Sequence, residues 1–243
     1  MARKAKIELP SVLTKDSWFY EANKEMCDPH LGKPYISYSS VNSWEDYRED
    51  FIKQKFAKIE VPGSVYANFG SYLGEAVEHG KFGENPDGFV GQENFQPFLD
   101  DRPEGAEYEK MILIDMGDYV ILGFIDIFSL NEDEAAIVVD LKTGGKGKEK
   151  QYESEDYIQI PLYAKAIEDQ GIKIATTGVW FVRREGSHIK PPLAVSKDQF
   201  WIELPYNEER VKYALDKVDR VVKEISSCYK TYKKIFGNVK AKV

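Results

Sequence analysis

The chain has 243 residues, a formal net charge of −8 and a sequence pI near 5.1. Its length suits one sizeable α/β domain with additions better than two independent domains. No apolar run approaches the ~18–20 residues of a membrane span, and the N-terminus lacks a signal-peptide apolar core, so we expect a cytosolic protein. The acidic balance argues against broad, non-specific nucleic-acid binding, which usually needs a basic face.

Cysteine and histidine are scarce. Only Cys27 and Cys228 are present, far apart in the sequence, which argues against a disulfide framework. The three histidines, His30, His79 and His188, show no zinc-ligand spacing. Neither residue type therefore predicts a metal or redox centre.

Two helices are predicted in the first third of the chain. Val41–Ile59 carries aromatic and aliphatic residues at helical intervals, with Asn42 or Ser43 as the expected cap. Pro62 and Gly63 end it, and a second helix covers about Val65–Glu78 and stops near Gly80. These patterns predict an N-terminal helical region over residues 1–60 and a core that begins near residue 65.

A segment rich in Gly, Pro, Asn and acidic residues follows, from Phe82 to Glu109, and reads as a long loop. Long loops inside compact domains are usually functional or mobile. Phe89, Phe95 and Phe98 within it suit anchors into the core better than the alternative, a ring that stacks on a nucleic-acid base.

Two strands are predicted next, over Val120–Phe128 and Ala135–Leu141, with turn chemistry at Asn131–Glu134. If the hairpin turns about Asp133, Asp126 lies opposite Asp140, since each is seven positions from that centre. A loop one residue shorter or longer would place Asp126 on the other face of the sheet.

Lys142 shares the face of Asp140, because residues two apart on a strand point the same way. Two carboxylates suit Mg²⁺ or Mn²⁺, and a neighbouring lysine can orient or deprotonate an attacking water or stabilise developing charge on phosphorus. The plain alternative is a solvated strand end, with Gly144 and Gly145 beginning a loop. The shared face of three charges favours phosphodiester hydrolysis.

The remaining elements complete an α/β order. A helix over Tyr157–Gln170 precedes a strand at Thr176–Arg183. Pro191–Pro192 indicates a loop, with His188 exposed just before it. A short strand at Phe200–Leu204 and a long amphipathic helix at Asn207–Phe236 follow. Because Met111–Gly145 looks like a β-meander, the order is helix–strand–strand–strand–helix–strand, which predicts a mixed sheet flanked by helices.

Positive charge is concentrated in two places. Lys146, Lys148 and Lys150 follow the Asp140–Lys142 corner, and we expect them to bind DNA. The stretch from Lys230 to Val243 contains five lysines and no acid. An acidic chain can thus still present a local cationic groove.

The motifs resemble a known family. Gly123-Phe-Ile-Asp126 followed by Asp140-Leu-Lys-Thr-Gly144 resembles the signature of the PD-(D/E)XK nucleases. The Q-x-x-x-Y pair Gln159 and Tyr163, and the segments Tyr38–Val41 and Phe69–Glu78, are similar to the RecB-like, phage-type exonuclease branch. The likeness runs from Tyr38 to Tyr163 and implies a restriction-endonuclease-like αβββαβ core over about 65–185. A C-terminal strand and long helix over 186–243 are additions, within a single domain of residues 1–243.

The sequence departs from the family at Gly74, where many relatives place a metal-binding histidine. His79 cannot replace it, because five helical steps turn it roughly 140° away. Glu78 lies only about 40° from Gly74, and relatives use a glutamate from this helix. Glu78 is therefore a candidate metal ligand, with a solvated helix charge as the equally weighted alternative.

The resemblance implies roles for individual residues. Asp126 and Asp140, with the backbone carbonyl of Leu141 and the help of Glu78, would bind one or two Mg²⁺ or Mn²⁺ ions. Lys142 would orient water or stabilise the transition state. Gln159 and Tyr163 would position that lysine or a DNA phosphate, the alternative being a polar helix face that closes onto the sheet. Two cysteines exclude the four-cysteine iron–sulfur cluster of some relatives.

The resemblance also implies a DNA nuclease, with exonucleolytic digestion in recombination, repair or phage genome processing as its setting. DNA is the expected partner in the bacterial or phage-infected host cytosol, a recombination or single-strand-binding protein is a further candidate partner, and no membrane is expected. Two alternatives stay open. The chain could bind nucleic acid, or serve in assembly, without cutting, or it could be an interaction module whose acidic surface mimics DNA.

Overall fold

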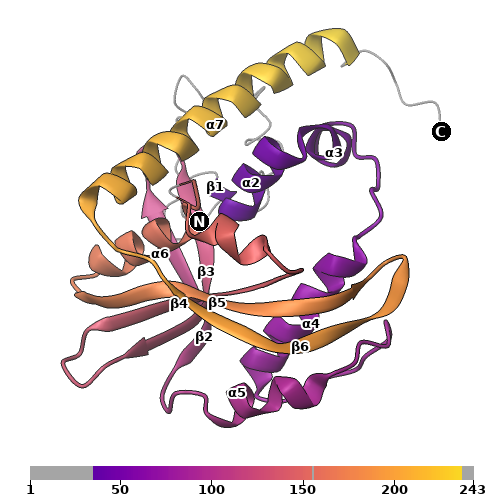
Figure 1. The fold of residues 1–243 in the computed structure, drawn as a ribbon. Helices are drawn as coiled ribbons and strands as arrows, with labels where there is room; N and C mark the ends of the chain where they lie inside the picture. Colours follow the sequence, from indigo (N-terminus) through magenta and orange to yellow (C-terminus); the bar gives the residue numbers. More distant parts are fainter. Residues whose placement is uncertain (1–34, 155, 237–243) are drawn as a thin grey trace, which may run out of the picture. The chain divides into compact units, whose positions relative to one another are not determined.

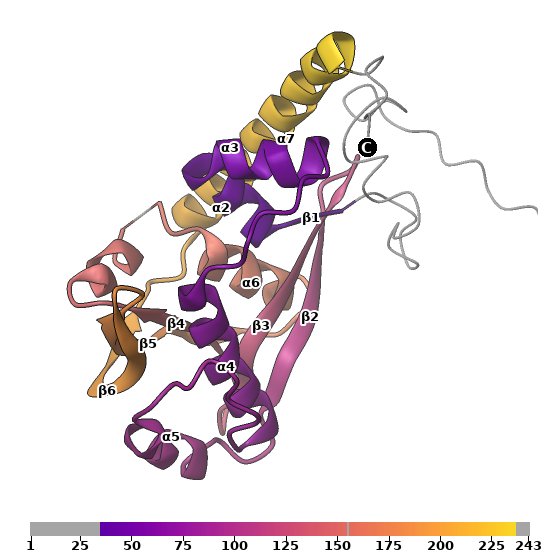
Figure 2. The same ribbon diagram turned by 90° about the vertical axis from the view of Figure 1, so that its right-hand side faces the viewer.

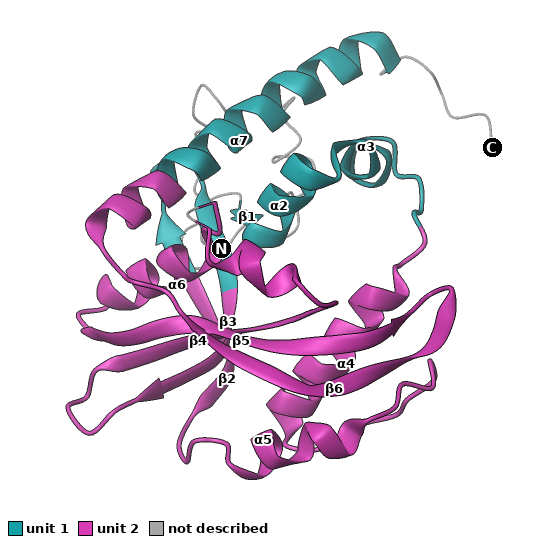
Figure 3. Ribbon diagram, viewed as in Figure 1, with its two compact units in different colours: residues 1–61, 113–123, 215–243 teal, residues 62–112, 124–214 magenta. Residues whose placement is uncertain are grey.

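A computed structural model describes residues 35–154 and 156–236 of the chain (Figure 1). Cys27, His30, Lys240 and Lys242 lie outside the described residues. Backbone contacts divide the chain into two compact units (Figure 3). Unit 1 comprises residues 1–61, 113–123 and 215–243, and unit 2 comprises residues 62–112 and 124–214. The expected extent of a single domain, 1–243, stays a prediction.

Unit 1 begins with a short strand and a broken helix. β1 (Tyr35–Ser37) pairs in parallel with the first residues of β3. It leads into α2 (Tyr38–Asp46), α3 (Arg48–Phe51) and a π-helical turn (Ile52–Phe56). The prediction of one helix from Val41 capped by Asn42 or Ser43 is wrong, because the Ser37 hydroxyl caps the helix by accepting from the Ser40 amide (3.2 Å).

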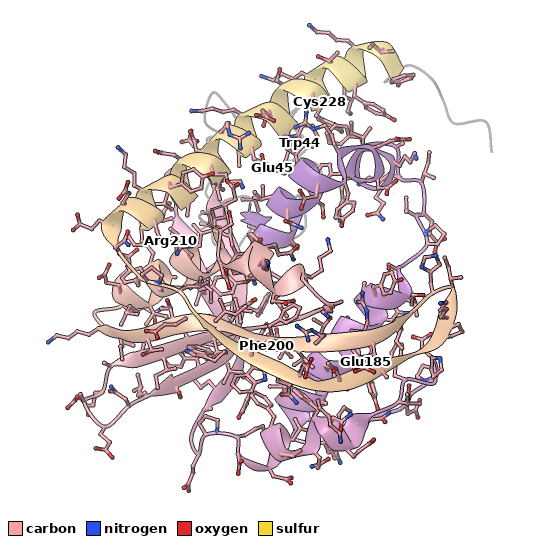
Figure 4. All side chains as sticks on the ribbon, in the orientation of Figure 1. Trp44, Glu45, Glu185, Phe200, Arg210 and Cys228 are labelled. Carbon is pink, nitrogen blue, oxygen red and sulfur yellow. The ribbon has the colours of Figure 1, made fainter. Side chains whose placement is uncertain are left out.

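Aromatic packing and polar contacts hold α2 and the π-helical turn to the part of α7 that lies in unit 1. Phe56 packs edge-on against Tyr229 at a ring-centroid distance of 4.8 Å. Trp44 and Glu45, labelled in Figure 4, also face α7. The Trp44 indole N–H donates to Glu224 (3.0 Å), and Glu45 pairs with Lys217 (2.9 Å). Cys228 forms no disulfide with another described residue.

Unit 2 contains most of a mixed sheet. The strand order is β3–β4–β5–β6, with β2 paired to β3 (Figures 1 and 2). β4 and β5 are parallel, whereas β3–β4 and β5–β6 are antiparallel. The strands are β2 (Glu107–Asp115), β3 (Val120–Leu130), β4 (Ala136–Gly144), β5 (Ile174–Ser187) and β6 (Lys190–Glu203).

Helices cover both faces of this sheet. Leu141 belongs to a buried cluster with α4 (Val65–His79), while its neighbour Asp140 accepts a hydrogen bond from Tyr157, just before α6 (Gln159–Glu168). Because successive residues of a strand point to opposite faces, α4 and α6 lie on opposite sides of β4. The order α4–β2–β3–β4–α6–β5 confirms the predicted αβββαβ core. The long C-terminal helix is α7 (Glu208–Phe236), one residue from its predicted start.

The limits of α4 follow from its caps. The Ser64 hydroxyl accepts from the Tyr66 amide (3.2 Å), and Gly80 ends the helix with a left-handed backbone (φ +72°). Among the described residues, no helix combines the length and apolar character needed to cross a bilayer.

The predicted loop from Phe82 to Glu109 is only partly a loop. It contains a 3₁₀ turn (Gln92–Asn94), α5 (Gln96–Asp100) and the first residues of β2. Phe89 and Phe95 are buried, and Phe98 packs against the same cluster. The phenylalanines therefore anchor this segment to the core, which confirms that prediction over the alternative of a ring that stacks on a base.

Several other boundaries differ from prediction. The proline pair Pro191–Pro192 is not a loop, because β6 begins at Lys190. An outer strand tolerates proline in its first residues, where no ladder hydrogen bond is lost. The predicted short strand at Phe200–Leu204 is the end of β6, so β5 and β6 form one long hairpin (Figure 1). α6 begins at Gln159 rather than Tyr157.

Candidate active site

The β3–β4 hairpin sets the register of the site. Its printed pairs include Ile127 opposite Val139 and Ser129 opposite Ile137, which are symmetric about position 133. The Asn131 carboxamide oxygen stabilises the turn by accepting from the amides of Asp133 (3.0 Å) and Ala135 (2.9 Å). The predicted register is thus confirmed, and Asp126 and Asp140 occupy the next positions along the two strands.

Asp126, Asp140 and Lys142 converge in unit 2. The Lys142 ammonium lies 2.7 Å from Asp140 Oδ2, and the Asp126 carboxylate accepts from the Leu141 backbone amide at 2.5 Å. Asp140 is fully buried, whereas the Lys142 side chain is 26% exposed. Lys142 and Asp126 are therefore partly exposed, and Asp140 is the member of the group that is shielded from solvent.

The charges of these groups shift one another's pKa. Burial raises the pKa of Asp126 well above the ordinary range, and Asp140 raises it further, while Lys142 and the Leu141 amide act in the opposite direction. Burial alone would lower the pKa of Lys142, but Asp140 and Asp126 outweigh burial and raise it. Lys142 is consequently an ammonium group, which suits stabilisation of negative charge.

A hydrogen-bonded chain from α6 reaches Asp140. The Tyr157 hydroxyl donates to Asp140 Oδ2 (2.5 Å) and lies 3.1 Å from the Gln159 carboxamide oxygen. The Gln159 amide donates to the Tyr163 hydroxyl (2.9 Å). Gln159 and Tyr163 are both buried. Gln159 and Tyr163 thus connect to Asp140 through Tyr157 and are shielded from solvent, and the roles expected for this pair stay predictions.

Sequence reasoning missed Tyr157 as a site residue. Tyr157 lies two positions before Gln159, and a tyrosine just before a helix belongs to no recognisable sequence motif. Only the fold brings its hydroxyl to Asp140.

Glu109 on β2 is a second site residue that the sequence did not reveal. Desolvation raises its pKa, as do the neighbouring charges of Glu78 and Asp140, while Lys142 opposes the rise. Its backbone is left-handed (φ +51°), which is uncommon for a residue other than glycine. Such local backbone geometry cannot be read from the residue type, and the position fell at the end of the predicted loop.

The carboxylates fit a divalent ion in one specific respect. Asp140 Oδ1 is buried and has no hydrogen-bond partner among the described residues. A buried carboxylate oxygen without a partner is costly, and a cation would satisfy it. Asp126, Asp140 and the Leu141 carbonyl would offer oxygen ligands of the kind that Mg²⁺ and Mn²⁺ prefer, with water and a substrate phosphate as the remainder.

The predicted helix ligands are arranged less favourably. Residues 35–154 and 156–236 contain no group of three or more His, Cys, Asp or Glu side chains placed to hold a metal ion. Glu78 is exposed near the end of α4 and acts on Glu109 through its charge. A side chain at Gly74 would meet no atom within 4 Å. His79 is exposed at the helix end, as expected. The metal role of Glu78 stays a prediction.

The predicted DNA-binding lysines lie directly beyond β4. Lys146, Lys148 and Lys150 are all exposed, on the loop and 3₁₀ turn (Lys148–Tyr152) that follow the strand. Their three side chains are therefore accessible, and they lie close in sequence to Lys142.

Comparison with known proteins identifies the family. The family model of the PD-(D/E)XK nuclease superfamily matches residues 81–235, which is more than half of the chain. The chain therefore belongs to the PD-(D/E)XK nuclease superfamily. The matched residues include Asp126, Asp140, Lys142 and the Gln159–Tyr163 pair, whereas α4 with Gly74 and Glu78 precedes them.

Solved structures show more distant similarity. A crystal structure of the protein SSO0001 is 15% identical, with 82% of each chain covered and a TM-score of 0.43. A candidate exonuclease from Eubacterium rectale is 14% identical, with 87% of this chain and 86% of that chain covered and a TM-score of 0.49. Similarities at this level do not assign an activity. A search of curated proteins finds no match.

Proposed function

We propose that this protein is a Mg²⁺- or Mn²⁺-dependent deoxyribonuclease that hydrolyses phosphodiester bonds. The observation that carries the proposal is the convergence of Asp126, Asp140 and Lys142, with Asp140 Oδ1 buried and lacking a partner among the described residues. Membership of a nuclease superfamily supports the same chemistry.

Each residue has a role in the proposed reaction. Asp126, Asp140 and the Leu141 carbonyl would hold the divalent ion, which when bound supplies an acidified water and neutralises charge on the scissile phosphate. The Lys142 ammonium donates to the phosphate oxygens or orients the water. Tyr157 fixes Asp140, and Gln159 and Tyr163 fix Tyr157. Lys146, Lys148 and Lys150 attract the DNA backbone.

The resemblance to the RecB-like branch supports an exonuclease that acts in recombination, repair or phage genome processing. A second candidate function is nucleic-acid binding without cleavage. It is favoured by Gly74, which stands where many relatives place a histidine, and by the absence of a three-ligand metal group among the described residues.

Digestion of linear and circular DNA tests the proposal. Wild type, Lys142→Ala and the control Lys173→Ala, an exposed lysine just before β5, are incubated with Mg²⁺, Mn²⁺ or chelator. We expect wild type and the control to cut only with metal, and Lys142→Ala to lose about a hundredfold or more of the rate, as when one transition-state donor is removed. Loss of linear DNA alone means an exonuclease, and nicked circles mean an endonuclease. DNA left intact by the wild type under every condition would favour the binding function.

A further inference from the structure

Arg184 on β5 differs from every other arginine that the structure describes. Arg48 and Arg220 pair with Glu224, and Arg183 pairs with Glu149. Arg102 and Arg210 donate to backbone carbonyls. Within residues 35–154 and 156–236, the Arg184 guanidinium has no carboxylate or carbonyl partner, and its Nε is buried without one.

The side chain is nevertheless held in place. Its guanidinium carbon lies 3.9 Å from the centroid of the Tyr66 ring, a cation–π contact. The Tyr66 hydroxyl lies 2.9 Å from His188 Nδ1 and accepts from the His188 backbone amide (3.1 Å). Tyr66, which belongs to α4, is thus held against the β5–β6 hairpin, and the face of its ring packs against the Arg184 guanidinium.

The neighbouring acid does not neutralise Arg184. Glu185, labelled in Figure 4, accepts instead from the Ser196 hydroxyl (2.8 Å) across the hairpin. Successive residues of β5 point to opposite faces, so Glu185 and Arg184 diverge. A stacked, half-buried guanidinium without an acid retains its terminal N–H donors for an anion.

The position of Arg184 places these donors at the end of β5 that lies next to the end of β4, on the face of the sheet opposite Asp140 and Lys142. β4 and β5 are parallel, and Gly144 pairs with Arg183, so the residues after Lys142 and around Arg184 reach the same edge of the sheet. A Cβ at Gly70, one helical turn after Tyr66, would lie 3.7 Å from the Thr143 hydroxyl. The helix that carries Tyr66 therefore packs against β4, the strand that carries Asp140 and Lys142.

A second set of contacts lies on the other face of the sheet, around Asp140. Tyr152 packs edge-on against Tyr157, with ring centroids 5.0 Å apart, and Tyr157 bonds Asp140. Burial lowers the pKa of Arg184, while Tyr66 and Tyr152 act in the opposite direction.

We propose that Arg184, backed by the Tyr66 ring, binds a backbone phosphate of the nucleic-acid strand whose scissile phosphate lies at Asp140 and Lys142. This inference rests on the proposed function of the site and adds a second anchor for the same strand. Arginine suits the task because its planar fork can hold two phosphate oxygens while its face stacks on an aromatic ring.

Binding measurements in chelator separate this anchor from catalysis. Labelled oligonucleotides are titrated with wild type, Arg184→Gln, Arg184→Lys and the matched control Lys173→Gln, which loses the same charge at the opposite end of β5. We expect Arg184→Gln to weaken binding about tenfold at moderate salt and to reduce the slope of log affinity against log salt by about one. The affinity of Arg184→Lys should lie between those of Arg184→Gln and wild type. The affinity of the control should match that of wild type within about twofold.

Neutral methylphosphonate linkages, introduced one position at a time, locate the contact. A neutral linkage at the contacted position should weaken binding by the wild type. The same linkage should leave the affinity of Arg184→Gln unchanged. Tyr66→Leu, which removes the platform and keeps the charge, should give a partial loss. Thermal unfolding of each variant confirms that it is folded, and inorganic phosphate as competitor distinguishes backbone binding from capture of a free anion.

The outcomes separate the two proposals. If the wild type cuts DNA with metal but Arg184→Gln binds with the wild-type affinity and salt slope, the phosphate anchor is wrong and the nuclease proposal stands. If inorganic phosphate alone displaces the oligonucleotide at low concentration, Arg184 is a free-anion site and the anchor is again wrong. If the wild type neither binds nor cuts, both proposals fail.

Discussion

At the scale of single residues, Asp140 is the centre of the site. One of its oxygens receives both the Lys142 ammonium and the Tyr157 hydroxyl, and the other has no partner among the described residues. Burial makes that second oxygen costly to leave alone. Asp140 thus combines a supported carboxylate with a second oxygen that has no partner among the described residues, as the proposed metal ligand requires.

Tyr157→Phe tests the support from α6. Without its hydroxyl, Asp140 loses a donor, and we expect about 10–100-fold lower metal affinity or activity, as for other outer partners of metal ligands. Higher Mn²⁺ should restore part of the rate. Tyr213→Phe is the matched control, since Tyr213 donates to the exposed Asp156. Equal metal requirements for Tyr157→Phe and wild type would contradict the role given to Tyr157.

At the scale of elements, the sequence predicted correctly those features that depend on interactions between residues close together in the chain. The β3–β4 register followed from turn chemistry at Asn131, and α4 followed from its spacing and Gly80. The start of α2 was missed because Ser37 caps it before the apolar pattern begins. The start of β6 was missed because Pro191–Pro192 indicates a loop unless a long partner strand, here β5, extends past it.

Two glycines provide an element-scale test. A Cβ at Gly74 in α4 meets nothing within 4 Å, so Gly74→Ala should stabilise the fold by about 0.5–1 kcal/mol through helix propensity. A Cβ at Gly144 would lie 2.9 Å from the Phe181 ring and from Lys148 Cβ, so Gly144→Ala should destabilise it by about 1–3 kcal/mol. Urea unfolding measures both changes. A loss of stability at Gly74, or none at Gly144, would contradict the packing described.

At the scale of the whole molecule, the charges are unevenly divided. The net charge of −8 coexists with three exposed lysines after β4 and with an arginine that has no acidic partner in the described part of the chain. Family membership, the αβββαβ order and the convergence of Asp126, Asp140 and Lys142 were predictable from motif spacing. Tyr157, Glu109 and Arg184 were not, because each depends on contacts between elements distant in sequence.

The central claim, that Asp126 and Asp140 form a divalent-metal site, also predicts how the protein responds to pH. The folded-state pKa of Asp126 is raised, so its stabilising contribution is present in acid and is lost as the pH rises. A bound ion replaces that proton, and metal affinity should therefore increase with pH. Metal-free protein should lose stability between about pH 5 and about pH 8, and added Mn²⁺ should restore it most at the higher pH.

Calorimetric titration of Mn²⁺ into wild type and Asp140→Asn, at about pH 5 and about pH 8, is the most direct measurement. The account predicts binding by the wild type that strengthens with pH, and a loss in Asp140→Asn larger than the ~10–100-fold effect of an outer partner. Equal Mn²⁺ affinity in the two proteins, or no heat of binding to the wild type at either pH, would contradict it.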